Sequence, residues 1–234
     1  MASYTETEIE ELCPTHICRD KEHNMTDRSK FQDQLNKLRK IILDGVSYFT
    51  VWEGLDREYG KYLNSTSAKY LDYFAPKGLD DFWWRYRGFL APTRNALLWS
   101  ALLQLSKAYD TDPRVVSLIN LIATARNNPS ELAPYATQDS LEIIQGNIAK
   151  NHEILVKLRH YRNTRLAHFD STEIESIKIY IHQVSSLIKE TKEIFNSLKY
   201  AYLEESDDFD LIMEDVTLHT SQVIDYLKKV EENN

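Results

Sequence analysis

The stretch that decides the fold is FQDQLNKLRKIILDGVSYFTVWEGLDREY, residues 31–59. Its apolar residues recur mostly at steps of three and four, which gathers them on one face of a helix with about 3.6 residues per turn. That face consists of Phe31, Leu35, Leu38, Ile41, Ile42, Phe49, Trp52, Leu55 and Tyr59. We therefore predict a long first helix that begins near Thr26 or Asp27 and ends near Gly60 or Asn64.

The same spacing continues along most of the chain. It predicts a short helix over 67–74 and longer helices over 82–108, 115–126, 139–158, 170–198 and 209–230. Pro92 marks a kink or restart, and Asp112-Pro113 fits an N-cap followed by a first helical residue. Asp170 with Glu173 fits a capping box. The acidic residues 204–208 are interpreted as a solvated turn between helices.

Composition supports a helical fold. Six glycines and six prolines make up about 5% of the 234 residues, against an average of about 12%. A β-sandwich or barrel needs many turn residues, so this scarcity argues against one. We predict an all-α, antiparallel bundle of five or six main helices. Residues 1–25 are expected to form a partly irregular arm, and 26–234 a single domain.

Charge and cysteine content limit the function classes. The net charge of −8 excludes a protein that coats nucleic acid by bulk positive charge, although it leaves room for a small basic site. Two cysteines exclude a disulfide scaffold and suit a reducing compartment. The apolar stretch around Ala96 to Leu105 is too short to span a bilayer, and the N-terminus carries no secretory signal. We expect a cytoplasmic protein without a membrane partner.

One segment stands out chemically: KLRHYRNTRLAHFD, residues 157–170. It places four cations and two histidines within twelve residues of an otherwise acidic chain. Arg159, Arg162 and Arg165 are spaced three apart and share a helix face. Clustered guanidinium groups repel one another unless an anion or carboxylates neutralise them, and their planar forks match phosphate oxygens. His168 can exchange a proton near neutral pH.

Helix geometry restricts how these groups combine. Arg162 and His168 are six residues apart, so on an ideal helix they point about 120° away from each other. They converge only if the helix ends or distorts before His168, or if a second chain supplies its own copies. The helix start expected at Asp170 is compatible with an end just before it.

Arg162-Asn163, four further residues and His168 together resemble the Arg-polar-(x)-His motif of HEPN domains, helical bundles that are widespread in prokaryotic conflict systems. The form Arg-Asn-x-x-Leu-Ala-His, followed by Asp170, is most similar to the abortive-infection branch of AbiU type. The Leu-rich segment from Trp99 to Asp110, ending in Tyr-Asp, and the helix expected over 113–122 are similar to that branch too. The resemblance covers roughly residues 30–200.

The resemblance implies a metal-independent endoribonuclease without a cofactor, acting as a homodimer whose two motifs face one cleft. His168 would assist proton transfer at the ribose 2′-OH or the leaving oxygen. Arg162 would hold the phosphate and its growing charge. Asn163 would orient the motif or contact the substrate, and Arg159 and Arg165 would contact the RNA. The expected products carry a 2′,3′-cyclic phosphate and a 5′-OH, in an antiphage, abortive-infection or toxin–antitoxin setting.

Other interpretations remain. A lysine often follows the Arg-Asn pair in this branch, and Thr164 stands there instead, with Arg165 as a substitute cation. Many HEPN domains lack activity, so the alternative is a non-catalytic module that binds RNA or a protein such as a cognate antitoxin. The third interpretation is a structural helical interaction protein in which the basic segment is a solvated helix end.

Two further segments carry weaker signals. Cys13, His16, Cys18 and His23 could assemble a zinc site, but their spacing matches no standard pattern, and an arm with two reduced thiols is the plainer interpretation. Residues 82–89, FWWRYRGF, bring aromatic side chains next to arginines. Such residues stack on RNA bases, reach a dimer or partner surface, or pack in a core.

Overall fold

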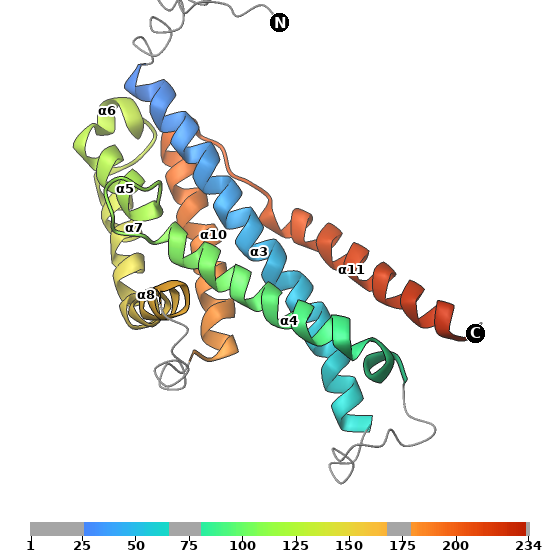
Figure 1. Ribbon diagram of the computed structural model, residues 1–234. Coiled ribbons are helices and arrows are strands. Elements are labelled where there is room, and N and C mark those ends of the chain that lie inside the picture. Colours follow the sequence, from blue (N-terminus) through green and yellow to red (C-terminus); the bar gives the residue numbers. More distant parts are fainter. Residues whose placement is uncertain (1–25, 66–80, 168–178, 233–234) are drawn as a thin grey trace, which may run out of the picture.

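The computed structural model describes residues 26–65, 81–167 and 179–232, and all regular elements within these ranges are α-helices (Figure 1). This confirms the all-α class. The elements are α3 (Asp27–Ser65), α4 (Asp81–Ala108), α5 (Leu118–Asn127), α6 (Pro129–Leu132), α7 (Gln138–Lys150), α8 (His152–Ala167), α10 (Ile181–Leu203) and α11 (Phe209–Glu232).

The long helices α3 and α4 run antiparallel and form the spine of the molecule (Figure 1). They approach closely at Gly45 of α3, where an added Cβ would lie 3.1 Å from the Cβ of Gln104 and 3.7 Å from the carbonyl oxygen of Ala101. A larger side chain at position 45 would therefore push α4 away. The predicted apolar face of α3 is confirmed, because seven of its nine members are buried: Phe31, Leu35, Leu38, Ile42, Phe49, Trp52 and Leu55.

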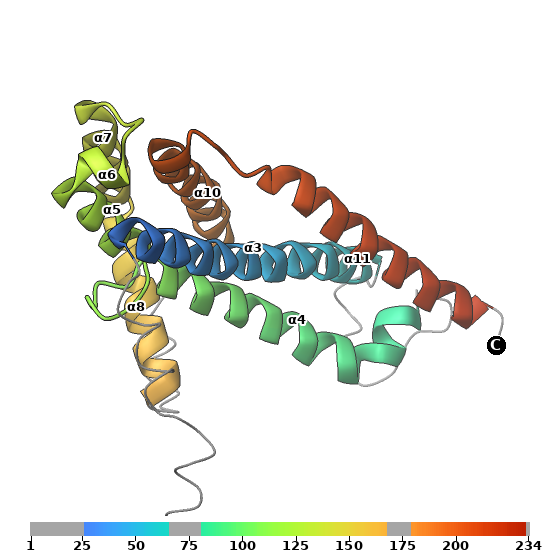
Figure 2. The ribbon, with the colours of Figure 1, turned by 90° about the horizontal axis from the view of Figure 1, so that it is seen from above.

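The core has two parts. The main cluster joins α3 and the C-terminal half of α4 to α5, α7, α8, α10 and the first residue of α11. A smaller cluster of Leu55, Leu90 and Ile224 lies where the far end of α3 meets α4 and α11. Figure 2 shows the consequence: parts of α3, α4 and α11 extend to one side, away from the body formed by α5 to α8 and α10.

The turn between α10 and α11 is held in place by ion pairs. Glu204 ends α10 in the left-handed conformation, with φ of 58°. The carboxylate of Asp207, only 10% exposed, accepts hydrogen bonds from Arg39 Nε at 2.9 Å and Lys199 Nζ at 3.1 Å. The interpretation of 204–208 as merely solvated is therefore wrong for Asp207, which ties the turn to α3.

Helix boundaries were predicted well where the apolar period is long. The expected helices over 82–108 and 209–230 correspond to α4 and α11; α4 includes Pro92, and its N-terminal part bends away from the rest of the helix (Figures 1 and 2). Asp112-Pro113 does not begin a helix: α5 begins at Leu118, and Ser117 is its N-cap, accepting a hydrogen bond from Asn120 N–H at 3.2 Å.

The expected helix over 139–158 is two helices in the structure. Thr137 caps α7, which ends at Lys150, and α8 begins after Asn151. The Asn151 amide bonds to the Asn147 carbonyl oxygen at 3.1 Å and to the Glu190 carboxylate, which anchors the break to α10. The helix expected over 170–198 corresponds only in part to α10, which begins at Ile181.

The arm 1–25, the short helix 67–74 and the capping box at Asp170 lie outside the described residues. None of the helices described is long and apolar enough to cross a membrane.

The contact at Gly45 gives a test of the spine. We expect Gly45→Val to lower the free energy of unfolding by about 1–3 kcal/mol, because its methyl groups overlap α4. The control is Gly146→Ala in α7, where an added Cβ meets nothing within 4 Å. This control is expected to stabilise by up to about 1 kcal/mol through helix propensity. Urea unfolding followed by circular dichroism measures both, and an unchanged stability of Gly45→Val would contradict the packing described.

Candidate functional site

Helix α8 carries the basic segment and crosses the C-terminal half of α4 (Figure 2). Its inner face buries Ile154 and Leu158. The ring of Tyr161 lies 5.3 Å, centroid to centroid, from the ring of Trp99 on α4. The helix is regular through Ala167. These contacts fix the rotation of α8, and therefore the direction in which each basic side chain points.

Arg162 points inward and forms an ion pair with Asp110. Its Nη1 lies 2.5 Å from Oδ2 of Asp110, with the two side chains 21% and 15% exposed. Asp110 follows the end of α4, and its Oδ1 accepts a hydrogen bond from the Asp112 backbone N–H at 3.0 Å. Arg162 Nε donates to Asn163 Oδ1 at 3.4 Å. Asp110 is thus the carboxylate that neutralises one of the clustered arginines.

The pKa of Asp110 reflects this environment. Partial burial alone would raise it, but hydrogen bonds from the Asp112 N–H and the Arg162 guanidinium, together with the charge of Arg162, hold the pKa below its ordinary value. Asp110 is therefore ionised at neutral pH, and the pair with Arg162 is an ion pair rather than a neutral hydrogen bond.

The neighbouring residue Tyr109 anchors this end of α4 to α10. Its buried hydroxyl lies 2.9 Å from Thr191 Oγ1, and that oxygen in turn lies 2.6 Å from the Leu187 carbonyl oxygen. The Leu187 carbonyl oxygen can only accept a hydrogen bond, so the Thr191 hydroxyl donates to it. The Tyr109 hydroxyl therefore donates to Thr191 Oγ1. Burial raises the pKa of the Tyr109 phenol. The Tyr-Asp pair thus joins three helices, with Tyr109 directed to α10 and Asp110 to α8.

The other predicted substrate residues lie elsewhere on α8. Arg159 and Asn163 are exposed and share the outer face of the helix, four residues apart. Arg159, three residues before Arg162, is exposed, whereas Arg162 is partly buried by its pair with Asp110. The side chain of Arg165 and the whole of His168 lie outside what the structure describes. The assignment of His168 therefore stays a prediction.

Thr164, which stands where the branch pattern often has a lysine, has a buried side chain in this structure. The residue is 4% exposed, and its Oγ1 donates to the His160 carbonyl oxygen at 2.9 Å. A lysine there would place its ammonium group in a buried environment, which carries a desolvation cost. The small Thr164 side chain, which departs from the branch pattern, fits the buried environment at this position.

Sequence reasoning did not single out Asp110 as a site residue. The only signal was the Tyr-Asp ending of the Leu-rich segment 99–110, which the resemblance included without a role. The contact joins residues 52 positions apart, and no spacing rule within one helix could reveal it.

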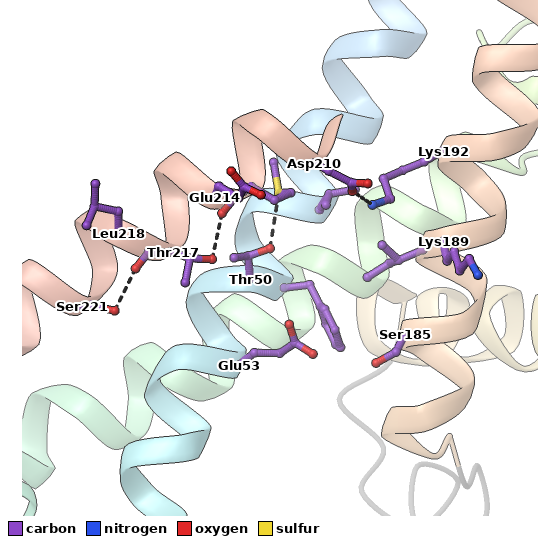
Figure 3. Close-up of a pocket in the computed structure, with 14 residues that line it drawn as sticks. Thr50, Glu53, Ser185, Lys189, Lys192, Asp210, Glu214, Thr217, Leu218 and Ser221 are labelled. Atoms are coloured by element: carbon purple, nitrogen blue, oxygen red, sulfur yellow. Dashed lines mark hydrogen bonds and ion pairs between the residues drawn. The ribbon is translucent and has the colours of Figure 1, made fainter. Parts of the chain in front are cut away.

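A separate groove of about 830 Å³ lies between α3, α10 and α11 (Figure 3). Lys192 Nζ lies 2.5 Å from Asp210 Oδ1 across it, and Thr50 donates to the sulfur of Met213. None of its lining residues belongs to α8, so the groove does not contribute to the Arg162 site. In the described part of the chain no three His, Cys, Asp or Glu residues form a metal-binding group, and Cys13, His16, Cys18 and His23 lie outside it.

Comparison with known proteins gives one match. The family model for HEPN domains of the AbiU2 type, described as AbiU2, matches residues 85–223. The match begins in α4, includes Asp110 and the whole basic segment, and ends in α11. No curated protein and no solved structure matches the chain significantly.

The ion pair of Asp110 gives a pH-dependent prediction. We expect Asp110→Asn to lower the free energy of unfolding at pH 7 by about 1–2 kcal/mol, because it weakens a largely desolvated charged hydrogen bond. The folded pKa of Asp110 is lowered, so the stabilisation is complete above about pH 5 and is lost as pH falls below about 4. The difference between wild type and variant should therefore shrink on acidification.

Urea unfolding at neutral and acidic pH measures this difference. The control is Asp112→Asn, whose carboxylate pairs with the 87% exposed Arg114 and should give a smaller loss. A difference for Asp110→Asn that stays constant between the two pH values would contradict the ion pair.

Proposed function

The chain belongs to the AbiU2 family of HEPN proteins, and we propose that it is an RNA-targeting protein of abortive-infection or toxin–antitoxin type that cleaves RNA without a metal ion. The observation that carries the proposal is the Arg162-Asn163…His168 motif, with Arg162 fixed by Asp110. Membership in the AbiU2 family supports a role in abortive infection and RNA targeting.

Arg162 is suited to hold the scissile phosphate. A guanidinium group has five N–H donors; Asp110 engages Nη1 and Asn163 engages Nε. Within the described residues Nη2 has no partner, so it can donate to a phosphate oxygen. Because Asp110 already fixes the side chain, little conformational entropy is lost when the phosphate binds.

The proposed reaction is internal transesterification. The ribose 2′-oxygen attacks the adjacent phosphorus while the bond from phosphorus to the 5′-oxygen breaks. His168 accepts the proton of the 2′-OH or delivers one to the departing 5′-oxygen. The negative charge that grows on the phosphate oxygens is stabilised by Arg162. The products are a 2′,3′-cyclic phosphate and a 5′-OH end.

We propose that Arg159 and Asn163 bind RNA beside the reacting phosphate. Both are exposed on the outer face of α8, where Arg159 can contact a neighbouring phosphate and Asn163 a base or ribose group. Arg165 is proposed for the same purpose on the basis of its position in the motif.

Helix geometry supports a second copy. On a continuous helix Arg162 and a position six residues later point about 120° apart, and α8 is helical through Ala167. We propose that the protein acts as a homodimer in which the motifs of both chains serve one cleft.

Cleavage is tested with labelled single-stranded RNA in the presence of EDTA. We expect wild type to cut, Arg162→Ala and His168→Ala to lose at least about 100-fold in rate, and Arg126→Ala to cut normally. Arg126 is an exposed arginine of α5 bonded to Gln145, and it serves as the matched control. Cyclic-phosphate ends identify the chemistry, and equal activity of His168→Ala would refute its catalytic role.

Asp110 is expected to act as a positioning residue. Asp110→Asn should lower kcat/KM by about 10- to 100-fold, because Arg162 loses the carboxylate that positions it and a small misplacement of a positioning group is costly in rate. The loss should fall mainly on kcat, because the substrate still meets a cationic Arg162 whose orientation is no longer fixed. A change confined to KM would instead assign Asp110 to RNA binding.

The second candidate function is a non-catalytic module that binds RNA or a cognate antitoxin. It is favoured by the small exposure of Arg162, 21%, and its engagement with a carboxylate, which also suit a structural ion pair. In that case RNA binding is salt-dependent and weakened by Arg159→Ala, and no cleavage occurs with any variant.

A further inference from the structure

Helices α7 and α10 enclose a groove that the proposed reaction does not use. Its volume is about 550 Å³, within the range typical of ligand pockets. Two contacts set the register of the helices. The Asn151 side chain bonds to the Glu190 carboxylate, and the Tyr135 backbone N–H donates to the Ala201 carbonyl oxygen at 3.0 Å. The helices are therefore antiparallel, and residues early in α7 face residues late in α10 (Figure 1).

One end of the groove is aromatic. Tyr135 and Tyr200 both line it and are 49% and 50% exposed. They lie at the same end, because the Tyr135 N–H bonds to Ala201, the residue after Tyr200. The floor of the groove includes the buried side chains of Ile144 and Ile194. A tyrosine ring is a platform on which any nucleobase can stack, because every base has a π-face.

The other end of the groove is polar. Asn147 and Glu193 line it, each about one helical turn from the contact between Asn151 and Glu190. The Asn147 side-chain oxygen accepts a hydrogen bond from Lys150 Nζ at 2.9 Å, so its NH₂ group is the part left to donate. Within the described residues the Glu193 carboxylate has no hydrogen-bond or ion-pair partner. This end therefore offers a ligand a carboxylate acceptor and an amide donor.

These two groups match the Watson–Crick edge of guanine. Guanine presents two adjacent donors, N1–H and the N2 amino group, which one carboxylate can accept together. Beside them lies the acceptor O6, which an amide N–H can reach. Adenine, cytosine and uracil do not present two adjacent donors next to an acceptor on this edge.

We propose that this groove binds single-stranded RNA, with a guanine held by Asn147 and Glu193 and a neighbouring base stacked on Tyr135 and Tyr200. The inference rests on the RNA targeting of the proposed function and deepens it, because it names a base that the protein recognises.

The charge of the groove favours a strand over a free nucleotide. Of the described residues that line it, none is lysine or arginine, so the phosphates of a free nucleotide would meet no positive charge there. A strand can place its phosphates on α8 instead. That helix begins directly after Asn151, and its exposed Arg159 lies within about 18 Å of Asn147 along the helix axes, twelve residues at about 1.5 Å each. The groove and the basic helix can therefore contact neighbouring parts of one strand.

Fluorescence anisotropy with the full chain and short labelled 2′-O-methyl oligonucleotides tests the guanine assignment. The methyl group removes the 2′-OH nucleophile, so binding is measured without cleavage. Two uridine strands carry either one guanine or one inosine, the base that lacks the N2 amino group. We expect wild type to bind the guanine strand at least about 5-fold more tightly, and Glu193→Gln to bind the two strands within about 2-fold of each other. The control Glu142→Gln, an exposed residue of α7 outside the groove, should behave as wild type.

The same assay tests the aromatic end. Tyr200→Ala should weaken binding of both strands by about 5- to 100-fold, because stacking on the ring is lost. Tyr226→Ala on α11, where the tyrosine is 67% exposed and lies outside the groove, is the matched control and should leave binding unchanged.

Three results would overturn the inference: equal affinity of wild type for the guanine and inosine strands, discrimination that survives Glu193→Gln, or an unchanged affinity of Tyr200→Ala. Guanosine monophosphate that competes as strongly as the guanine strand would overturn it too, by assigning the groove to a free nucleotide. Since none of these strands can be cut, a protein that discriminates guanine but cleaves no RNA would refute the nuclease proposal and leave the groove assignment intact.

Discussion

The close packing of α3 against α4 is the constraint on which the rest of the structure depends. Gly45 lets the two backbones approach, and the resulting pair provides the surface onto which α5, α8, α10 and α11 pack. The packing of α4 sets Tyr109 and Asp110, which directly follow its last residue, at a junction of three helices. A shift of α4 along α3 by one helical turn, about 5.4 Å, would remove Asp110 from reach of Arg162. The geometry of the basic site is thus set by a packing contact far from it.

The ion pair of Arg162 with Asp110 contributes more to the orientation of the guanidinium group than to the stability of the fold. Removing two charges from water carries a desolvation cost that their attraction offsets only in part, so the pair is a weak reason for stability. It is a stronger reason for orientation, because the carboxylate is itself held by the Asp112 N–H and leaves the guanidinium little freedom. The same pair reduces the net positive charge offered to an RNA phosphate. A site built this way favours a precisely placed phosphate contact over strong non-specific attraction, which agrees with the acidic character of the chain.

The sequence predicted what depends on local periodicity and missed what depends on distant contacts. The long apolar periods of α3, α4 and α11 identified these helices and the buried face of α3. The break at Asn151 was missed because Asn147 and Glu190 hold it, the latter from α10. Asp112-Pro113 suggested a helix start, but Ser117 provides a cap five residues later. In the candidate site, the spacing of Arg159, Arg162 and Arg165 indicated anion chemistry, while the inward turn of Arg162 follows from Asp110, 52 residues away.

The family match covers residues 85–223 and leaves out α3, although α3 supplies a large part of the main core. Both partners of the ion pair, Asp110 and Arg162, lie within the matched segment. Helix α4 is held on one side by α8, inside that segment, and on the other by α3, outside it. The recognised segment therefore contains the site, while one of the two packing surfaces that position the site comes from the helix that precedes it.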